Sequence, residues 1–260
     1  MSVPSGGQNR LPLVLGSGAV VVAAVVAIAL GVNSASAPLP AQPTPTPVVP
    51  TPTPSPTPTA APTIAFADCS KVKFGAVLQP LNPPANVHTY SAEPAMTIDQ
   101  TKLYQATIAT SRGDIVLCLQ PDLAPITVNN FVTLARNHFY DGLPFHRVVS
   151  AFVIQAGDPQ CVGNVPAPPA TPSGTCGEGG PGYEWANEPV HQQYVEGCVA
   201  MANSGTADSN GSQFFICTAD DSSTLTPTYN LFGKVETGMD VALKIVQGDL
   251  MKSITVREQT

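Results

Sequence analysis

Residues 145–158 read FHRVVSAFVIQAGD, and residues 210–216 read NGSQFFI. Both stretches mix apolar residues typical of β-strands with polar residues that are costly to bury unless something pairs with them. Polar side chains in that setting usually face a ligand. The two stretches therefore predict one site that contains an arginine, two glutamines and two aromatic residues, namely Arg147, Gln155, Gln213, Phe152 and Phe215.

The charged residues of the chain are concentrated after residue 63. The 260 residues carry a formal charge of −7, and the first 63 contain no acid and a single base, Arg10. The remainder has ten bases and eighteen acids, a balance of −8. Such an acidic balance argues against nucleic acid and anionic membrane surfaces as partners. There is also no G-x-G-x-x-G motif or phosphate-binding loop, so nucleotide chemistry has no support.

The N-terminal region contains a long apolar run. Residues 11–32 carry no charge and are rich in Val, Ala and Leu, which is long enough for a helix to cross a bilayer. We expect an uncleaved signal anchor with residues 1–10 in the cytoplasm and the rest of the chain outside the cell membrane, since Arg10 alone orients it. The alternative is a signal peptide, because residues 35–37 read ASA, and cleavage after Ala37 would secrete the protein.

Cysteines and histidines bear on the compartment and on metal binding. The cysteine count is six, and no close C-x-x-C pair occurs. This pattern favours disulfides outside the cell over a zinc site or a redox motif. The spacing of the histidines does not suit a metal site, so we expect structural roles for His138, His146 and His191.

The chain divides into a linker, a lead-in segment and a domain. Residues 38–63 hold eleven of the 28 prolines and consist mostly of Pro, Thr and Ala, so they cannot bury a core. As polyproline II, this linker would extend up to about 80 Å at about 3.1 Å per residue. Residues 64–100 show little periodicity and are expected to be an irregular lead-in segment. The folded domain is expected at 101–260.

Hydrophobic patterns within the domain predict strands and two helices. A helix is expected to begin at Pro125, continue through Val128 and Phe131, and end near residues 141–142, and a second is expected at 239–246. Eight short strands are expected, at 104–110, 113–119, 145–148, 152–157, 197–201, 213–217, 231–235 and 253–257. This set predicts a closed antiparallel barrel with helical plugs.

Five motifs occur in a fixed order along this domain. They are FHR at 145–147 with Phe152 and Gln155, GGPGY at 179–183, MAN at 201–203, NGSQFFICT at 210–218 and FGKV at 232–235. In these motifs the sequence resembles the cyclophilin family of peptidyl-prolyl cis-trans isomerases, over roughly residues 101–258. The resemblance implies a mainly β fold, a closed eight-stranded antiparallel barrel capped by two α-helices. It also implies a monomer without cofactor or metal.

The family reaction rotates the peptide bond before proline. Amide resonance gives that bond a rotation barrier of about 18–20 kcal/mol. A catalyst need only favour the twisted amide, whose proline nitrogen gains a lone pair that accepts a hydrogen bond. A guanidinium suits this task because it is permanently charged and donates several hydrogen bonds.

Motif positions then assign roles to individual residues. By resemblance, Arg147 is the catalytic donor, Gln155 orients it and contacts the peptide, and Phe152 lies beside it at the proline pocket. The remaining lining of the pocket would be Val153, Phe215, Leu225 and, at the rim, Tyr229. The peptide backbone would be held by Gln213, Asn203 and Ala202.

Three positions depart from better-known members of the family. Val153 replaces a frequent Met, which makes the pocket floor smaller. Thr224 stands where many members carry a tryptophan that binds cyclosporin, so weak cyclosporin binding is expected. Tyr229 stands where many members carry His, and both side chains can donate a hydrogen bond.

The loop between Asp158 and Gly179 is longer than in compact members of the family. It contains five prolines and two cysteines, and we predict that a Cys161–Cys176 disulfide clamps it. Closing a loop of about 15 residues stabilises a fold by about 3 kcal/mol in the chain-entropy model. Three pairings remain open among Cys69, Cys118, Cys198 and Cys217.

The expected function is therefore that of an extracytoplasmic, membrane-tethered prolyl isomerase. Its partners would be proline-containing peptides and unfolded proteins, and it would assist the folding of secreted or cell-wall proteins. The alternative is a chaperone module that uses the same fold to bind proline segments without turnover. The intact Arg147 favours the enzyme.

Overall fold

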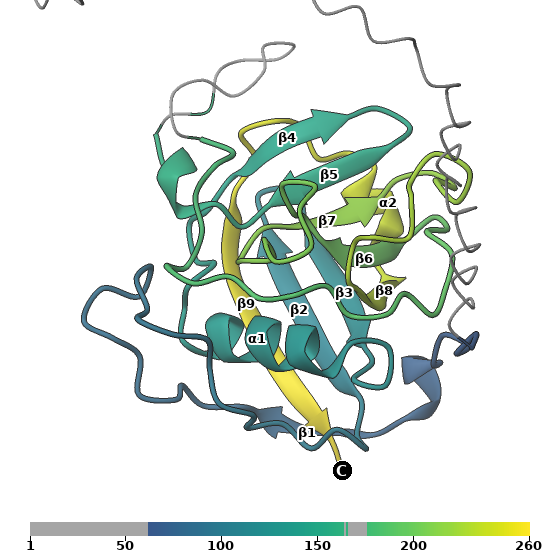
Figure 1. The fold of residues 1–260 in the computed structure, drawn as a ribbon, viewed down its shortest axis with the longest axis horizontal. Coiled ribbons are helices and arrows are strands. Elements are labelled where there is room, and N and C mark those ends of the chain that lie inside the picture. The colour runs from purple at the N-terminus through teal and green to yellow at the C-terminus, as the bar shows by residue number, and fades with distance from the viewer. Residues whose placement is uncertain (1–61, 164, 166–175) are drawn as a thin grey trace, which may run out of the picture. The chain divides into compact units, whose positions relative to one another are not determined.

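The structure is a computed structural model that describes residues 62–163, 165 and 176–260 (Figure 1). The predicted signal anchor at 11–32, the alternative cleavage after Ala37 and the linker up to residue 61 lie outside this part of the chain. Among the described residues, no helix combines the length and the apolar character that a membrane span requires.

The described strands form one antiparallel sheet in the order β1-β9-β2-β3-β8-β6-β7-β5-β4. Each of the eight expected strand regions contains a strand, and the lead-in segment adds a ninth. The strands are β1 (Phe74–Val77), β2 (Tyr104–Thr110), β3 (Asp114–Leu119), β4 (Phe145–Val149), β5 (Val153–Ala156), β6 (Cys198–Met201), β7 (Phe214–Cys217), β8 (Leu231–Thr237) and β9 (Met251–Gln259).

The prediction of a closed eight-stranded barrel is wrong, because this sheet has nine strands and two ends. A strand has only two hydrogen-bonding edges. Those of β9 are taken by β2 and by β1, which pairs Phe74 with Gln259. At the other end, β4 forms a ladder only with β5, and its outer side meets only an isolated bridge between Pro144 and Leu250. No ladder among the described residues therefore joins β4 to β9.

The first helix, α1 (Pro125–Arg136), begins where it was expected and ends earlier. Pro125 fits the first turn because its fixed φ is helical and its missing N–H is not needed there. Glu188 caps that turn from a distant loop, accepting the N–H groups of Ile126 (2.9 Å) and Thr127 (2.8 Å). The helix stops at Arg136 because His138 adopts a left-handed φ of 62°, which reverses the chain.

The second helix, α2 (Met239–Ala242), is one turn long instead of spanning 239–246. After it, the amides of Lys244 and Ile245 bond to carbonyls three residues back, which is the tighter 3₁₀ pattern. Leu243 and Val246 are exposed. Ile245 is buried in the core, so the apolar residues after the first turn are divided between the core and the surface.

The lead-in segment is bound to the domain at several points. A disulfide joins Cys69 to Cys118 of β3. The buried Gln120 accepts the amide of Ala67 (2.7 Å) and donates to Ala65 (3.0 Å). The segment then supplies β1 and passes along the side of the domain that carries α1 (Figure 1). Its irregular sequence is thus stabilised by specific tertiary contacts, not by its own periodicity.

Two apolar clusters lie on opposite faces of the sheet. Because successive side chains of a strand point to opposite faces, neighbouring residues separate. Phe214 lies in the cluster under α1, whereas Phe215 lies in the other. We call the first the core face and the second the site face. The site-face cluster consists of the buried Leu123, Val153, Tyr194, Cys198, Ala200, Phe215, Cys217 and Leu231.

Candidate active site

Arg147 and Gln155 lie opposite each other in the hairpin formed by β4 and β5. They are cross-strand partners in the ladder, so both side chains project from the same face. The guanidinium Nη1 donates a hydrogen bond to Gln155 Oε1 over 3.3 Å. The turn between the strands is tight, with Ala151 at a left-handed φ of 52°. The hairpin thus holds the arginine beside its glutamine.

Gln213 continues this line of hydrogen bonds. Gln155 Nε2 donates to Gln213 Oε1 over 2.9 Å. Gln213 Nε2 in turn donates to the carbonyl oxygens of Gly177 (3.0 Å) and Gly179 (2.8 Å). The structure therefore brings together the three polar residues that the sequence placed in one site. The two glycine carbonyls extend the set beyond the sequence prediction.

Phe152 lies directly beside the arginine. The guanidinium carbon is 5.8 Å from the centroid of its ring, within the range of a cation–π contact. The ring is partly buried and packs against the site-face cluster. Arg147 thus lies at the border between an apolar surface and the glutamines.

The predicted proline pocket is an apolar surface on the site face. Val153 and Phe215 are buried within the cluster, and the other predicted lining residues are partly buried against it, namely Phe152, Ala202, Leu225 and Tyr229. The rings of Phe215 and Tyr229 meet edge to face, with centroids 5.5 Å apart. Thr224, at the position linked to cyclosporin, is exposed.

Tyr194 supports this rim and was missed by the sequence analysis. Its hydroxyl donates to the carbonyl of Tyr229 (2.8 Å) and accepts the amide of Tyr229 (3.0 Å). Burial raises the pKa of Tyr194, so the phenol stays neutral. It lies in a stretch without periodicity, which gave no signal of its role.

Asn203 has a different environment from the other predicted residues. Its Nδ2 donates to the carbonyl of Thr228 (2.9 Å) and its Oδ1 accepts the amide of Gly205 (3.0 Å), so the side chain connects two loops.

Asn203 also lines a cavity of about 650 Å³ that extends from Gln155 and Gln213. In the described part of the chain, the cavity wall also contains Glu178 and Glu184 and no basic residue. The GGPGY motif supplies part of this wall, but the sequence did not reveal the cavity.

The histidines are separated and each has its own surroundings. His146 is 1% exposed, and burial lowers the pKa of its ring, which is therefore neutral at pH 7. His138 contacts Asp141, and His191 contacts the carbonyl of Pro62.

Three disulfides occur in the described part of the chain. One joins Cys161 to Cys176, as predicted from the long loop. The pairings that the sequence left open are Cys69–Cys118 and Cys198–Cys217.

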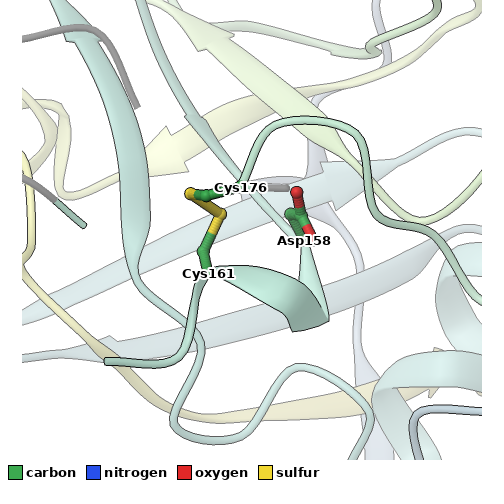
Figure 2. Close-up of side chains that lie close together, drawn as sticks. All are labelled: Asp158, Cys161 and Cys176. Atoms are coloured by element: carbon green, nitrogen blue, oxygen red, sulfur yellow. A yellow bond between two sulfur atoms is a disulfide. The ribbon is translucent and has the colours of Figure 1, made fainter. Parts of the chain in front are cut away.

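Figure 2 shows the carboxylate of Asp158 beside the Cys161–Cys176 disulfide. Asp158 and the two sulfurs offer ligand atoms within 4.8 Å of one another. In this structure the sulfurs are bonded to each other, and the carboxylate accepts backbone hydrogen bonds.

This geometry defines a class of site. A permanently charged donor lies at the edge of an apolar surface, and amide groups beside it can pair with a peptide backbone. Among the described residues that form this site, no nucleophile is held against a general base. Such a site suits a reaction that changes the shape of a bound peptide without breaking a bond.

Comparisons with known proteins agree with this class. The family model described as cyclophilin type peptidyl-prolyl cis-trans isomerase/CLD matches residues 105–259. The chain belongs to this family, and it is a peptidyl-prolyl cis-trans isomerase.

Two relatives and one solved structure illustrate the match. A peptidyl-prolyl cis-trans isomerase of Helicobacter pylori is 41% identical over 157 residues, which are 59% of this chain and 86% of the relative. Peptidyl-prolyl cis-trans isomerase B of Bacillus subtilis is 40% identical over 140 residues, 53% of this chain and 87% of the relative. A cyclophilin-type isomerase from Cryptosporidium parvum has a similar structure, with a TM-score of 0.50 and 25% identity over 59% of this chain and 97% of its own.

Proposed function

We propose that Arg147 catalyses the isomerisation by donating a hydrogen bond to the proline nitrogen of a bound peptide. The observation that carries this proposal is the position of its guanidinium, 3.3 Å from Gln155 Oε1 and 5.8 Å from the Phe152 ring. The first contact fixes its direction and the second keeps it against the apolar surface. A proline ring on that surface would place its nitrogen near the free guanidinium N–H groups.

The physical basis is preferential binding of the twisted amide. In the planar ground state the nitrogen lone pair is delocalised and accepts hydrogen bonds poorly, whereas rotation localises it. A donor at that nitrogen therefore stabilises the transition state more than the substrate, which is the condition for catalysis. Each 1.36 kcal/mol of this preference is worth about tenfold in rate.

The other residues bind the peptide. The surface around Val153 and Phe215 takes the proline ring, with Leu225 and Tyr229 at its edge. Gln155 and Gln213 pair with the peptide backbone, together with the backbone of Ala202 and Asn203. With valine in place of methionine at the pocket floor and Thr224 at the rim, cyclosporin binds weakly.

We also propose that the enzyme works outside the cytoplasm, tethered by residues 11–32. Two observations support this location. The N-terminal run is long and uncharged, and all six cysteines are paired in disulfides, which persist in oxidising compartments. The clients would be unfolded secreted or cell-wall proteins, and the enzyme would act on them as a monomer. Cleavage after Ala37 would release the same enzyme, and mass spectrometry of the native N-terminus distinguishes the two forms.

The test compares the full chain with Arg147→Ala in a protease-coupled assay on an Ala-Pro peptide. We expect kcat/KM to fall at least about 100-fold, the typical effect of removing one donor that stabilises a transition state. The matched control is Arg136→Ala, which removes an arginine that bonds the carbonyl of Gln79 on the other side of the domain (2.7 Å). Equal rates for the wild-type and Arg147→Ala proteins, both at the uncatalysed level, would favour the alternative of a non-catalytic binding module.

A further inference from the structure

A short segment of backbone holds Gln213 in place. We call residues 176–179 the strap. It presents the carbonyl oxygens of Gly177 and Gly179 to Gln213 Nε2, at 3.0 Å and 2.8 Å. The strap also lines the cavity next to the candidate active site. Its position therefore determines where the amide of Gln213 can lie.

Asp158 holds the opposite side of the strap. Its carboxylate is 0% exposed. Oδ2 accepts the amides of Gly177 (2.5 Å) and Gly179 (3.0 Å), and Oδ1 accepts the amide of Gln160 (2.7 Å). Among the residues that the structure describes, no ion pair involves this carboxylate. A buried charge of this kind depends on such hydrogen bonds, so the strap and Asp158 fix each other.

The Cys161–Cys176 disulfide is a second attachment of the strap to the domain. Asp158 is the N-cap of the short 3₁₀ helix Pro159–Cys161, and the disulfide ties the last residue of that helix to the first residue of the strap. Figure 2 shows the Asp158 side chain next to this disulfide. The strap also needs its glycines. Gly177 has a left-handed φ of 101°, and a Cβ on Gly179 would collide with the Asp158 carboxylate.

We propose that Asp158 and this disulfide are positioning elements for Arg147, acting through the strap and the two glutamines. The two strap carbonyls accept only N–H groups, so the amide nitrogen of Gln213 must face them and its oxygen must face Gln155. The same constraint turns the oxygen of Gln155 toward the guanidinium. Hydrogen bonds aligned in series also polarise one another. This inference rests on the proposed role of Arg147.

The first test measures kcat and KM of the full chain and of Asp158→Asn with an Ala-Pro peptide. An asparagine in the same orientation offers an amide nitrogen to at least one backbone N–H, which releases part of the helix turn or the strap. We expect kcat/KM to fall about tenfold, mostly in kcat, which is less than the about 100-fold that a misplacement of 1 Å can cost. A rise in KM with kcat unchanged would contradict the positioning of Arg147.

A double-mutant cycle separates positioning from general damage to the fold. The effects of mutations within one hydrogen-bond network are not additive. In a Gln213→Ala background the connection to Arg147 is already cut, so adding Asp158→Asn should change kcat/KM by less than about twofold. The same tenfold loss in both backgrounds would overturn the proposal.

The disulfide gives a test that does not require Asp158→Asn to fold. We expect the double variant Cys161→Ser, Cys176→Ser to lower kcat/KM about threefold to tenfold at 10 °C. This loss is smaller than the about 100-fold that a 1 Å misplacement can cost, because Asp158 still holds the strap and Arg147 should move by less than 1 Å. The matched control is Cys69→Ser with Cys118→Ser, which removes a disulfide from the lead-in segment and should keep the wild-type rate. Equal losses for both pairs, or none for either, would overturn the inference. A failure of the proposed function would look different, because Arg147→Ala would then keep the wild-type rate in the same assay.

Discussion

The two faces of the sheet use the same strands for different purposes. On the core face, Phe214 packs against Phe131 and Tyr140, with ring centroids 5.3 Å and 5.6 Å apart, and all three rings are fully buried. On the site face, Phe215 packs against the partly exposed Tyr229, next to the cavity that Gln213 lines. One face is closed by a helix, whereas the other remains open beside hydrogen-bonding groups.

This difference shows how a small domain can separate stability from function. Burial of complete aromatic rings supplies the larger share of folding free energy. The site face retains partly exposed apolar residues beside a line of polar groups that are hydrogen-bonded to one another. Adjacent residues in one strand should therefore differ in what their loss does.

The largest expected effect is that of Phe214→Ala. Removing a fully buried aromatic ring costs about 3–5 kcal/mol, because the cavity left behind is only partly refilled. Chemical denaturation should show this loss of unfolding free energy. At a temperature where the variant is folded, KM for an Ala-Pro peptide should stay near the wild-type value. A large rise in KM would mean that the core face also shapes the pocket.

Phe215→Ala should show the reverse pattern. We expect a loss of stability of about 3 kcal/mol, at the lower end for Phe→Ala, because its ring lies at the edge of the site-face cluster against the partly exposed Tyr229. Peptide binding should weaken about tenfold, which corresponds to about 1.4 kcal/mol. Peptide titration followed by chemical shifts measures the affinity directly. Unchanged affinity would remove Phe215 from the pocket.

The two faces also differ in how well the sequence predicted them. The two sequence stretches predicted Arg147, Gln155 and Gln213 in one site, and hydrogen bonds join these three side chains. These features depend on local pattern and on ladder register. The contribution of Asp158 to the strap depends on backbone groups of Gly177 and Gly179, which leave no trace in hydrophobic periodicity.

Pairing between strands and between cysteines far apart in the chain was also not predictable from the sequence. The sheet has two ends because β1, from a segment without periodicity, pairs with β9. The cysteine pairings beyond Cys161–Cys176 depend on which strands become neighbours, and spacing along the chain does not reveal this. The backbone changes to 3₁₀ bonding after α2, where Leu243 and Val246 are exposed. Each of these features is decided by tertiary context.

The rim of the pocket offers a smaller effect. Thr224 is exposed, so Thr224→Trp should be tolerated and should increase cyclosporin affinity about tenfold, or about 1.4 kcal/mol. An added indole supplies apolar area and an N–H donor at the site face. Isothermal titration of both proteins with cyclosporin gives the comparison. Nanomolar binding by the wild-type chain would show that this position does not limit the affinity.

The smallest expected effect concerns pH. Burial lowers the pKa of His146, an effect that nearby Asp158 opposes and Arg147 reinforces. The unfolded chain therefore binds a proton before the folded one does. The stability due to the neutral ring is present above pH 6.5, the ordinary value for histidine, and is lost as the pH falls below it.

We expect this loss to stay below about 1 kcal/mol over the first pH unit below that value, within the limit of 1.36 kcal/mol per unit for one group. Urea unfolding at several pH values should show a smaller slope for His146→Leu than for the wild-type chain. Equal slopes would mean that His146 does not contribute. The isomerase rate itself should be flat from pH 7 to 8.5, because Arg147 stays charged throughout.

The central claim is that Arg147 acts on the twisted amide and not on peptide binding as such. Exchange NMR on an Ala-Pro peptide measures both properties in one sample. For Arg147→Ala the account predicts a peptide affinity within about threefold of wild type and cis–trans exchange slowed at least about 100-fold. Exchange that stays fast in the variant, or that slows only in proportion to lost affinity, would contradict it.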